Sequence, residues 1–390
     1  MRLTNYEERQ RKCATLPTEI TGWNLPDDIT NNILARLHIR YLMRCRCVSR
    51  SWLVLISDPI FIDMHLKNQR LLQLNNVEDT DVVVFDPDAF STTNYYSMVL
   101  EHVGCSNESL KPFPLPPFHF SRDDELVDSC NGLLCIWNLG DKNIHIWNPI
   151  TGEVLDIPSP NLMATQFEST DTHFGFGYDS TRNEYKVVAI SYPDDTDPDP
   201  KFIIVAEVWT LGLGSWRNIG DFPFLPTTEY FSMDGSLHWQ SNMYMNREIG
   251  VLGIGSFDVR NEKFQFVLLP PHLNSNPDLD SVDLGALGGC ISAVDYSSPG
   301  RAEIWIMKHF GLQESWTKQY VLTMAGEFRH TKLLCLLTRG EVLFVFNGDK
   351  LISCDPKTGQ VKEVGLSSYY RVDWLPFVGT LVSPMIGGGA

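Results

Sequence analysis

The chain has 390 residues and a formal net charge of −17, with 43% hydrophobic and 20% charged residues. This composition excludes wholesale disorder and is typical of a globular protein with a small module and one large domain. Seven basic and four acidic residues between 24 and 70 give that stretch a charge of +3, which leaves −20 on the remainder. A body that negative repels phosphate backbones, which argues against a nucleic-acid partner.

The N-terminal end and the cysteines bear on the cellular compartment. No apolar run approaches the roughly 18–20 residues that a membrane span requires, and residues 1–13 lack the apolar stretch of a secretory signal. The nine cysteines are scattered and form no Cys-x-x-Cys pair, which favours free thiols over disulfides or metal ligands. We therefore expect no membrane partner and a location in the cytoplasm, the nucleus or both.

Residues 1–21 are expected to form a flexible tail that precedes a first helix. Pro26 suits a first helical turn because its missing N–H has no partner there, and Asp27 and Asp28 suit the positive end of the helix dipole. Apolar residues then follow at helical spacing and define one face. These residues are Ile29, Ile33, Leu34 and Leu37.

A second helix is predicted from about Leu42 to Ile56, and a third starts at Asp58-Pro59, an N-cap aspartate followed by a proline. The apolar residues of the second helix share an arc of about 100°. They are Cys45, Val48, Trp52, Leu55 and Ile56. A module of three short helices is marginally stable alone. It is therefore expected to pack on a partner, with a cap on its own C-terminal domain as the alternative.

After Arg70 the pattern changes to short runs of β-branched and aromatic residues between Gly, Pro, Asn and Asp clusters. Repeated units begin near Ser129, Thr172, Tyr230, Leu287 and Lys332, at the spacing of four-stranded propeller blades. A sixth unit would join Phe377–Val382 to strands from residues 71–101 and so remove exposed sheet edges. We predict six blades over residues 71–385, with seven blades or a β-sandwich as alternatives, and a tail over 386–390.

Chemical motifs are sparse in this sequence. Gly-x-Ser-x-Gly, His-Glu-x-x-His and Walker-type patterns do not occur. Gly175-Phe176-Gly177 lacks the third glycine of a dinucleotide site and is interpreted as a turn between strands. The acidic run Asp194–Pro200 lacks the glycine and glutamate of a calcium loop and is interpreted as a solvated loop. The ten histidines are dispersed, so we predict no catalytic residue, cofactor or metal site.

The helical stretch resembles the F-box, the motif that docks onto the Skp-type adaptor of an SCF ubiquitin ligase. The matching residues are Leu25-Pro26, Asp28, Ile33-Leu34, Arg36-Leu37, Leu42, Arg44, Arg46, Val48, Ser49-Arg50, Trp52, Leu55-Ile56, Pro59, Phe61 and His65-Leu66. His38 stands where the family usually has proline. The resemblance assigns residues 22–67 to an F-box.

The β-rich part resembles the kelch-like, F-box-associated domain of a large plant F-box family. The shared residues are Asn131-Gly132-Leu133, Trp147-Asn148-Pro149-Thr151-Gly152, Gly175-Phe176-Gly177-Tyr178-Asp179, Asp234-Gly235-Leu237-His238-Trp239, Ser256-Phe257-Asp258 and Leu381-Val382-Ser383-Pro384. True kelch repeats carry a Gly-Gly doublet in each blade, whereas here Gly288-Gly289 is the one such internal pair. The implied fold is a short three-helix F-box followed by an all-β propeller-like domain.

The resemblance implies a non-catalytic substrate adaptor of an SCF-type ligase. It would bind a Skp-type protein, and through it a cullin, while the β-domain holds a protein target for ubiquitination and degradation. The residues expected to contact the adaptor are Leu25, Pro26, Ile29, Ile33, Leu34, Leu37, Leu42 and Val48, whereas Trp52, Leu55 and Ile56 are expected to form the module's own core. The alternatives are a propeller-fold enzyme, such as a glycan-active enzyme or an oxidase, and a Skp-binding scaffold without a role in ubiquitination.

Overall fold

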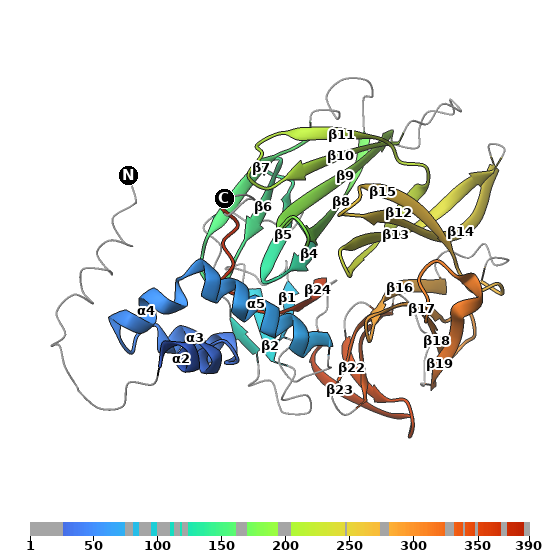
Figure 1. The fold of residues 1–390 in the computed structure, drawn as a ribbon. Helices are drawn as coiled ribbons and strands as arrows, with labels where there is room; N and C mark the ends of the chain where they lie inside the picture. Colours follow the sequence, from blue (N-terminus) through green and yellow to red (C-terminus); the bar gives the residue numbers. More distant parts are fainter. Residues whose placement is uncertain are drawn as a thin grey trace.

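The computed structural model places helices beside a ring of antiparallel sheets (Figure 1). The residues that it describes are 26–74, 81–85, 95–99, 110–112, 118, 124–160, 170–193, 204–245, 248–273, 281–323, 331–337, 340–347, 350–367 and 373–385. The α-helices of this part are α2 (Asp27–Leu34), α3 (Ile39–Cys45), α4 (Arg50–Ile56) and α5 (Pro59–Leu74), here called the helical module. Leu25, the predicted tails and the acidic run from Asp194 lie outside the described residues.

The predicted second helix is two helices, because the chain turns between Cys45 and Arg50. Ser49 has an extended backbone (φ −154°, ψ 162°), and its Oγ accepts a hydrogen bond from the Trp52 N–H at 3.1 Å, as an N-cap residue does. The start predicted at Asp58 is confirmed, since its Oδ1 accepts from the Ile60 N–H at 2.8 Å. Helix α5 then continues to Leu74, past the expected end of the module at residue 67.

Substitution of the N-cap residue of α4 tests this split. Ser49→Ala removes the acceptor for the Trp52 N–H and is expected to lower the free energy of unfolding by about 1 kcal/mol, as N-cap losses typically do. Urea unfolding followed by tryptophan fluorescence measures the change. Ser49→Asp retains an acceptor and should stay within a few tenths of a kcal/mol of wild type. Equal losses for both variants would contradict the cap assignment.

The described strands form six antiparallel sheets of four strands each. The first three along the chain are β4 (Glu125–Cys130), β5 (Leu133–Asn138), β6 (Asn143–Trp147), β7 (Val154–Pro158); β8 (Thr170–Asp179), β9 (Glu184–Pro193), β10 (Val205–Thr210), β11 (Trp216–Asp221); and β12 (Leu225–Met233), β13 (Ser236–Met245), β14 (Glu248–Asp258), β15 (Lys263–Leu268). The next two are β16 (Val282–Leu287), β17 (Cys290–Asp295), β18 (Arg301–Met307), β19 (Trp316–Thr323); and β20 (Lys332–Leu336), β21 (Val342–Phe346), β22 (Lys350–Asp355), β23 (Gln360–Ser367).

The last sheet joins the first three described strands to the last one and closes the propeller. It consists of β24 (Asp373–Phe377), β1 (Asp81–Phe85), β2 (Tyr95–Val99) and β3 (Leu110–Pro112). Strand β24 pairs with β1, and each innermost strand of the propeller contacts the innermost strands of the two neighbouring sheets. The predicted ring closure and the propeller are thus confirmed. The closing strand ends at Phe377, however, where the prediction had it begin, and the residues that follow take another role described below.

Gly175 and Gly177 lie inside β8, so the predicted turn at this place is wrong. A Cβ on Gly175 would lie 2.9 Å from side-chain atoms of both Leu237 and Trp239, and a Cβ on Gly177 would lie 2.8 Å from Val259. Glycine lets a neighbouring backbone or side chain approach a strand closely. The Gly-x-Gly pattern therefore indicates tight packing between the β8–β11 and β12–β15 sheets, because residues of the second sheet fill the space above each glycine.

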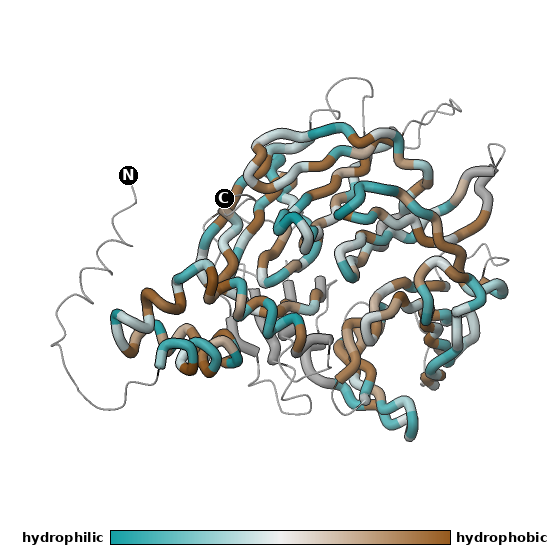
Figure 2. The backbone as a smooth tube through the Cα atoms, in the orientation of Figure 1, coloured by the Kyte–Doolittle hydropathy of each residue, from teal (hydrophilic) through white to brown (hydrophobic). Residues whose placement is uncertain are grey.

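Cysteines and hydropathy agree with a packed interior. The described cysteines are free thiols, and burial raises the pKa of Cys130 and Cys335 to about 12, which keeps both protonated at neutral pH. Figure 2 shows hydrophobic residues along the strands of the ring and also along the helices at its side. Among the described helices, none combines the length and the hydropathy that a membrane crossing requires.

Candidate functional site

The helical module carries an unusual share of the exposed apolar side chains. Half of the large hydrophobic side chains that are exposed in the described part of the chain lie within residues 26–71. Excluding Leu71 at its far end, they are Ile29, Ile33, Tyr41, Val48, Val54 and Ile60, here called the helical apolar surface. Single exposed apolar residues are ordinary, but a concentration of them on one small element marks a protein contact site.

The other side of the module is sealed. Ala35, Ile39, Ile56 and Phe61 are buried together, and Trp52 and Leu55 pack against them, which confirms the predicted core role of Trp52, Leu55 and Ile56. This core also includes Leu381 and Ile150 of the propeller domain. The module therefore packs on its own C-terminal domain through this core, which confirms the alternative of a cap, while the residues of the helical apolar surface stay exposed. Packing on a partner remains a prediction.

The predicted contact residues separate into two groups. Ile33 and Val48 are 50% and 65% exposed, and Ile29 and Pro26 are also exposed. Leu37 is half-buried.

The predicted adaptor contact is wrong for Leu34 and Leu42. Their side chains are 3% and 0% exposed and lie inside the module's core. Both belong to the helical face that meets Ile56, Phe61 and Leu381, so neither offers its side chain to a partner in this conformation.

Three exposed residues were missed by the sequence prediction. Val54 is 71% exposed and Ile60 is 80% exposed, although Ile56 on the same helix as Val54 and Phe61 next to Ile60 are buried. Tyr41 lies on α3 with the Arg44 guanidinium 5.9 Å from its ring centroid. The signal for Val54 was present, since at 100° per residue it falls outside the arc of Trp52, Leu55 and Ile56.

The helical module also carries exposed basic residues. Arg36, Arg44 and Arg50 are exposed, while Arg46 is partly covered and its Nη2 lies 3.4 Å from the Ser57 Oγ. An apolar centre with a charged rim is the usual anatomy of a protein interface. Arginines at such a rim steer an acidic partner toward the surface and raise the association rate more than the affinity.

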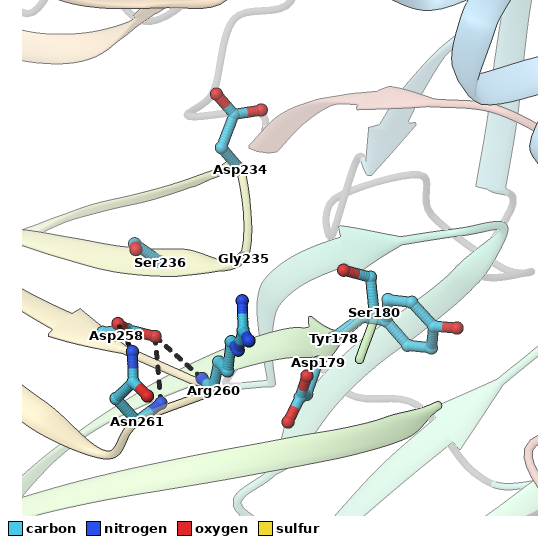
Figure 3. Close-up of a pocket in the computed structure, with 9 residues that line it drawn as sticks. All are labelled: Tyr178, Asp179, Ser180, Asp234, Gly235, Ser236, Asp258, Arg260 and Asn261. Atoms are coloured by element: carbon cyan, nitrogen blue, oxygen red, sulfur yellow. Dashed lines mark hydrogen bonds between the residues drawn. The ribbon is translucent and has the colours of Figure 1, made fainter. Parts of the chain in front are cut away.

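A polar hollow of about 270 Å³ lies where the β8–β9, β12–β13 and β14–β15 turns meet (Figure 3). Two of its carboxylates, Asp179 and Asp258, are engaged in the turns themselves. Asp258 Oδ1 accepts from the Arg260 and Asn261 N–H groups at 2.9 and 3.1 Å. Burial opposes ionisation of Asp179, but hydrogen bonds from Thr181 and Arg182 outweigh it and lower the pKa of Asp179 to about 2. These two groups are turn caps rather than reacting groups.

A buried carboxylate lies among the innermost strands. Asp128 on β4 accepts hydrogen bonds from the Tyr230 hydroxyl and the Ser129 N–H, both at 2.7 Å. The same Tyr230 hydroxyl accepts from the Phe176 N–H at 3.0 Å and so links β4, β8 and β12. Burial raises the pKa of Asp128 to about 6 despite these hydrogen bonds. The group joins three neighbouring sheets, and both of its oxygens are occupied.

Three potential metal ligands also come together. His272, Asp295 and Glu303 bring ligand atoms within 4.8 Å of one another. The Glu303 carboxylate is already paired with Arg301 at 2.6 Å and with Lys318 at 2.5 Å. A divalent cation at this place would have to displace two cationic side chains, so the arrangement favours the ion pairs.

Comparisons with known proteins assign both parts of the chain. Residues 23–63 match the model of the F-box domain, and residues 100–368 match that of the F-box associated beta propeller domain. The chain is 25% identical to the F-box protein At3g07870 of Arabidopsis thaliana, over 89% of each chain. It is 28% identical to the F-box/kelch-repeat protein At3g23880 of the same plant, over 76% of this chain and 78% of that one. A solved structure of a nidogen/laminin complex aligns with a TM-score of 0.46 at 13% identity, over 77% of this chain and 99% of that one.

Proposed function

Because this chain belongs to the F-box proteins that carry an F-box-associated β-propeller domain, we propose that it is the substrate-recognition subunit of an SCF-type ubiquitin ligase. The helical module docks onto a Skp-type adaptor and, through it, onto a cullin. The propeller holds a protein target. Ubiquitin is transferred because the complex keeps the target close to the charged conjugating enzyme, which raises the effective concentration of the reactants.

The helical apolar surface is the single observation that carries this proposal. Ile29 and Ile33 are one turn apart on α2 and therefore share a face, and Val48 precedes the cap of α4. Burial of each such side chain contributes about 1.5–3 kcal/mol before the costs of association are counted. Several of them in one interface suffice for a tight complex, whereas a module that served only as a cap would have no reason to expose them.

The chain itself is proposed to be non-catalytic. Several carboxylates that could serve a glycan-active propeller have structural roles, since Asp179 and Asp258 cap turns and Asp128 accepts hydrogen bonds from Tyr230 and Ser129. Proximity requires no acid, base or nucleophile from this chain. We also propose a location in the cytoplasm or the nucleus, which is supported by the free thiols of the described cysteines.

A pair of assays tests the function. The purified full chain is expected to form a stoichiometric complex with a purified Skp-type adaptor, measured by size-exclusion chromatography. Bound proteins are then captured from plant cells that express either the wild-type chain or the variant Ile33→Asp, Val48→Asp, which retains the propeller but loses the adaptor.

The proposed target should bind both chains and accumulate with the variant, because its degradation is blocked there. When the proteasome is inhibited, the wild-type chain should capture as much target as the variant does. A captured protein whose lifetime is the same with and without the chain would support a scaffold instead, and absence of a complex with the adaptor would contradict the proposal as a whole.

A further inference from the structure

The residues after β24 do not extend the sheet but lie against the helical module. Residues Val378–Pro384, here called the C-terminal segment, are bound to the β4–β7 sheet by Asn148, whose Nδ2 donates to the Thr380 and Val382 carbonyl oxygens at 3.1 and 2.6 Å. The Thr380 hydroxyl donates to the Asn131 carbonyl oxygen. Figure 1 shows this segment, in red, near the β4–β7 sheet and the helices.

The fit of the C-terminal segment on its sheet is close. Gly132 has φ +80°, and a Cβ there would lie 2.7 Å from the Thr380 backbone nitrogen. Asn148 is completely buried, and its Oδ1 accepts from the Ile150 N–H at 2.8 Å while its amide holds the segment. The C-terminal segment thus binds to Asn131-Gly132 and Asn148. These residues belong to the motifs that the sequence shares with F-box-associated domains.

The opposite side of the C-terminal segment completes the core of the helical module. Leu381 is 4% exposed and packs with apolar residues of α2–α5. Gly379 lies against α3, where a Cβ would come within 2.7 Å of Ile39 Cγ2. Ile150, next to Asn148, packs on the same core. A helical module of this size buries too little surface to be stable by itself, so these propeller residues supply part of what it lacks.

Helix α5 adds a second connection at the same place. Leu66 belongs to the core between the β4–β7 and β8–β11 sheets. The Arg70 Nε donates to Asn131 Oδ1 at 2.9 Å, and its guanidinium lies 4.3 Å from the centroid of the Tyr178 ring. Module, C-terminal segment and propeller therefore meet around Asn131. The segment directly follows β24, the strand that pairs with β1 and closes the ring.

We propose that the C-terminal segment couples closure of the propeller to the formation of an adaptor-binding helical module. Leu381 and Asn148 are positioning residues: neither belongs to the helical apolar surface, but both hold α2–α4 in the arrangement that presents it. A chain whose ring has not closed would lack Leu381 in the module's core and would bind the adaptor weakly. The readout with the adaptor rests on the function proposed above, whereas the coupling itself can be measured without the adaptor.

The test compares variants of the full chain by amide hydrogen exchange and by adaptor affinity. Leu381→Asp is expected to speed exchange in α2–α4 at least ten-fold and to weaken adaptor binding about ten-fold, because apparent affinity falls with the fraction of competent molecules. Asn148→Ala, which releases the segment without placing a charge in the core, should act in the same direction. Exchange in β12–β15 should stay unchanged. Leu381→Met and the exposed Met385→Asp are the controls and should match wild type in both measurements.

The outcomes separate the two proposals. If the wild-type chain does not bind the adaptor, the proposed function fails, and the exchange data still decide the coupling. If Asn148→Ala and Leu381→Asp leave exchange in α2–α4 equal to that of Met385→Asp, the coupling is wrong. If Leu381→Asp opens the whole propeller, Asn148→Ala decides: faster exchange confined to α2–α4 supports the coupling, and faster exchange spread equally over β12–β15 overturns it.

Discussion

Replacement of Ile33 and Val48 by aspartate is expected to weaken binding to a Skp-type adaptor at least 100-fold. Both side chains are at least half exposed in the free chain, so the substitutions remove little folding energy. In the complex each would place a carboxylate where an apolar side chain should be buried, and a buried unpaired charge is strongly unfavourable. Isothermal titration calorimetry of the purified full chain with the adaptor measures the loss.

The control variant introduces the same two negative charges, but at exposed leucines of the propeller. Leu139 and Leu213 are 50% and 72% exposed and lie far along the chain from the helices. Leu139→Asp with Leu213→Asp should leave adaptor affinity within about two-fold of wild type, since exposed sites change stability little. An undiminished affinity of the Ile33→Asp, Val48→Asp chain, with its far-ultraviolet circular dichroism unchanged, would show that the adaptor binds elsewhere.

The second large effect concerns the buried carboxylate of Asp128. Burial raises its pKa from 3.8 to about 6. Between these two pH values, the carboxyl group is mostly protonated in the folded state and mostly ionised in the unfolded state. The carboxylate therefore costs nothing below about pH 4, and its cost to stability grows to about 3 kcal/mol as the pH rises above 6. Asp128→Asn abolishes this titration. The stability of the variant relative to wild type should rise by about 3 kcal/mol across that range, measured as urea-unfolding free energies at several pH values.

Tyr230 provides a control variant that should enlarge the pH dependence of stability, whereas Asp128→Asn should remove it. Its hydroxyl donates to Asp128 Oδ2 at 2.7 Å, and this hydrogen bond lowers the pKa of the carboxyl. Tyr230→Phe removes the donor and should extend the pH-dependent loss of stability to higher pH. A stability difference between wild type and Asp128→Asn that does not change between pH 4 and pH 7 would show that the carboxylate is solvated and not buried as described.

The propeller was predictable because its signals are local and repeated. Turn residues such as Asn131-Gly132 and Asp234-Gly235 recur at blade spacing, and each of these four residues has positive φ in the structure, a conformation that Asn, Asp and Gly adopt at low cost. The predicted unit starts at Ser129, Thr172 and Tyr230 fall within β4, β8 and β12.

The glycines of β8 misled the prediction, because a Gly-x-Gly pattern has the same appearance in a turn and in a strand covered by a neighbouring sheet. Only the position of Trp239 and Leu237 above them distinguishes the two. The split of the second helix was predictable in principle from Ser49, a residue that favours N-cap positions. Periodicity concealed it, since α3 and α4 continue a similar apolar pattern.

The amino-acid sequence alone determined the family, the order of a helical module before a six-sheet propeller and the start of α5, because these depend on motifs and spacings within a few residues. It also indicated that the first and last strands of the propeller share a sheet, because closure of the ring removes exposed sheet edges. Tertiary structure alone decided that Leu34 and Leu42 are buried whereas Ile33 and Val48 remain exposed. Leu34 and Leu42 share a helical pattern with Ile33 and Val48, but only the first two lie in the core that residues of all four helices form with Leu381. Leu381 lies more than 300 positions away in the chain, so local periodicity contains no information about which face of the helices it covers.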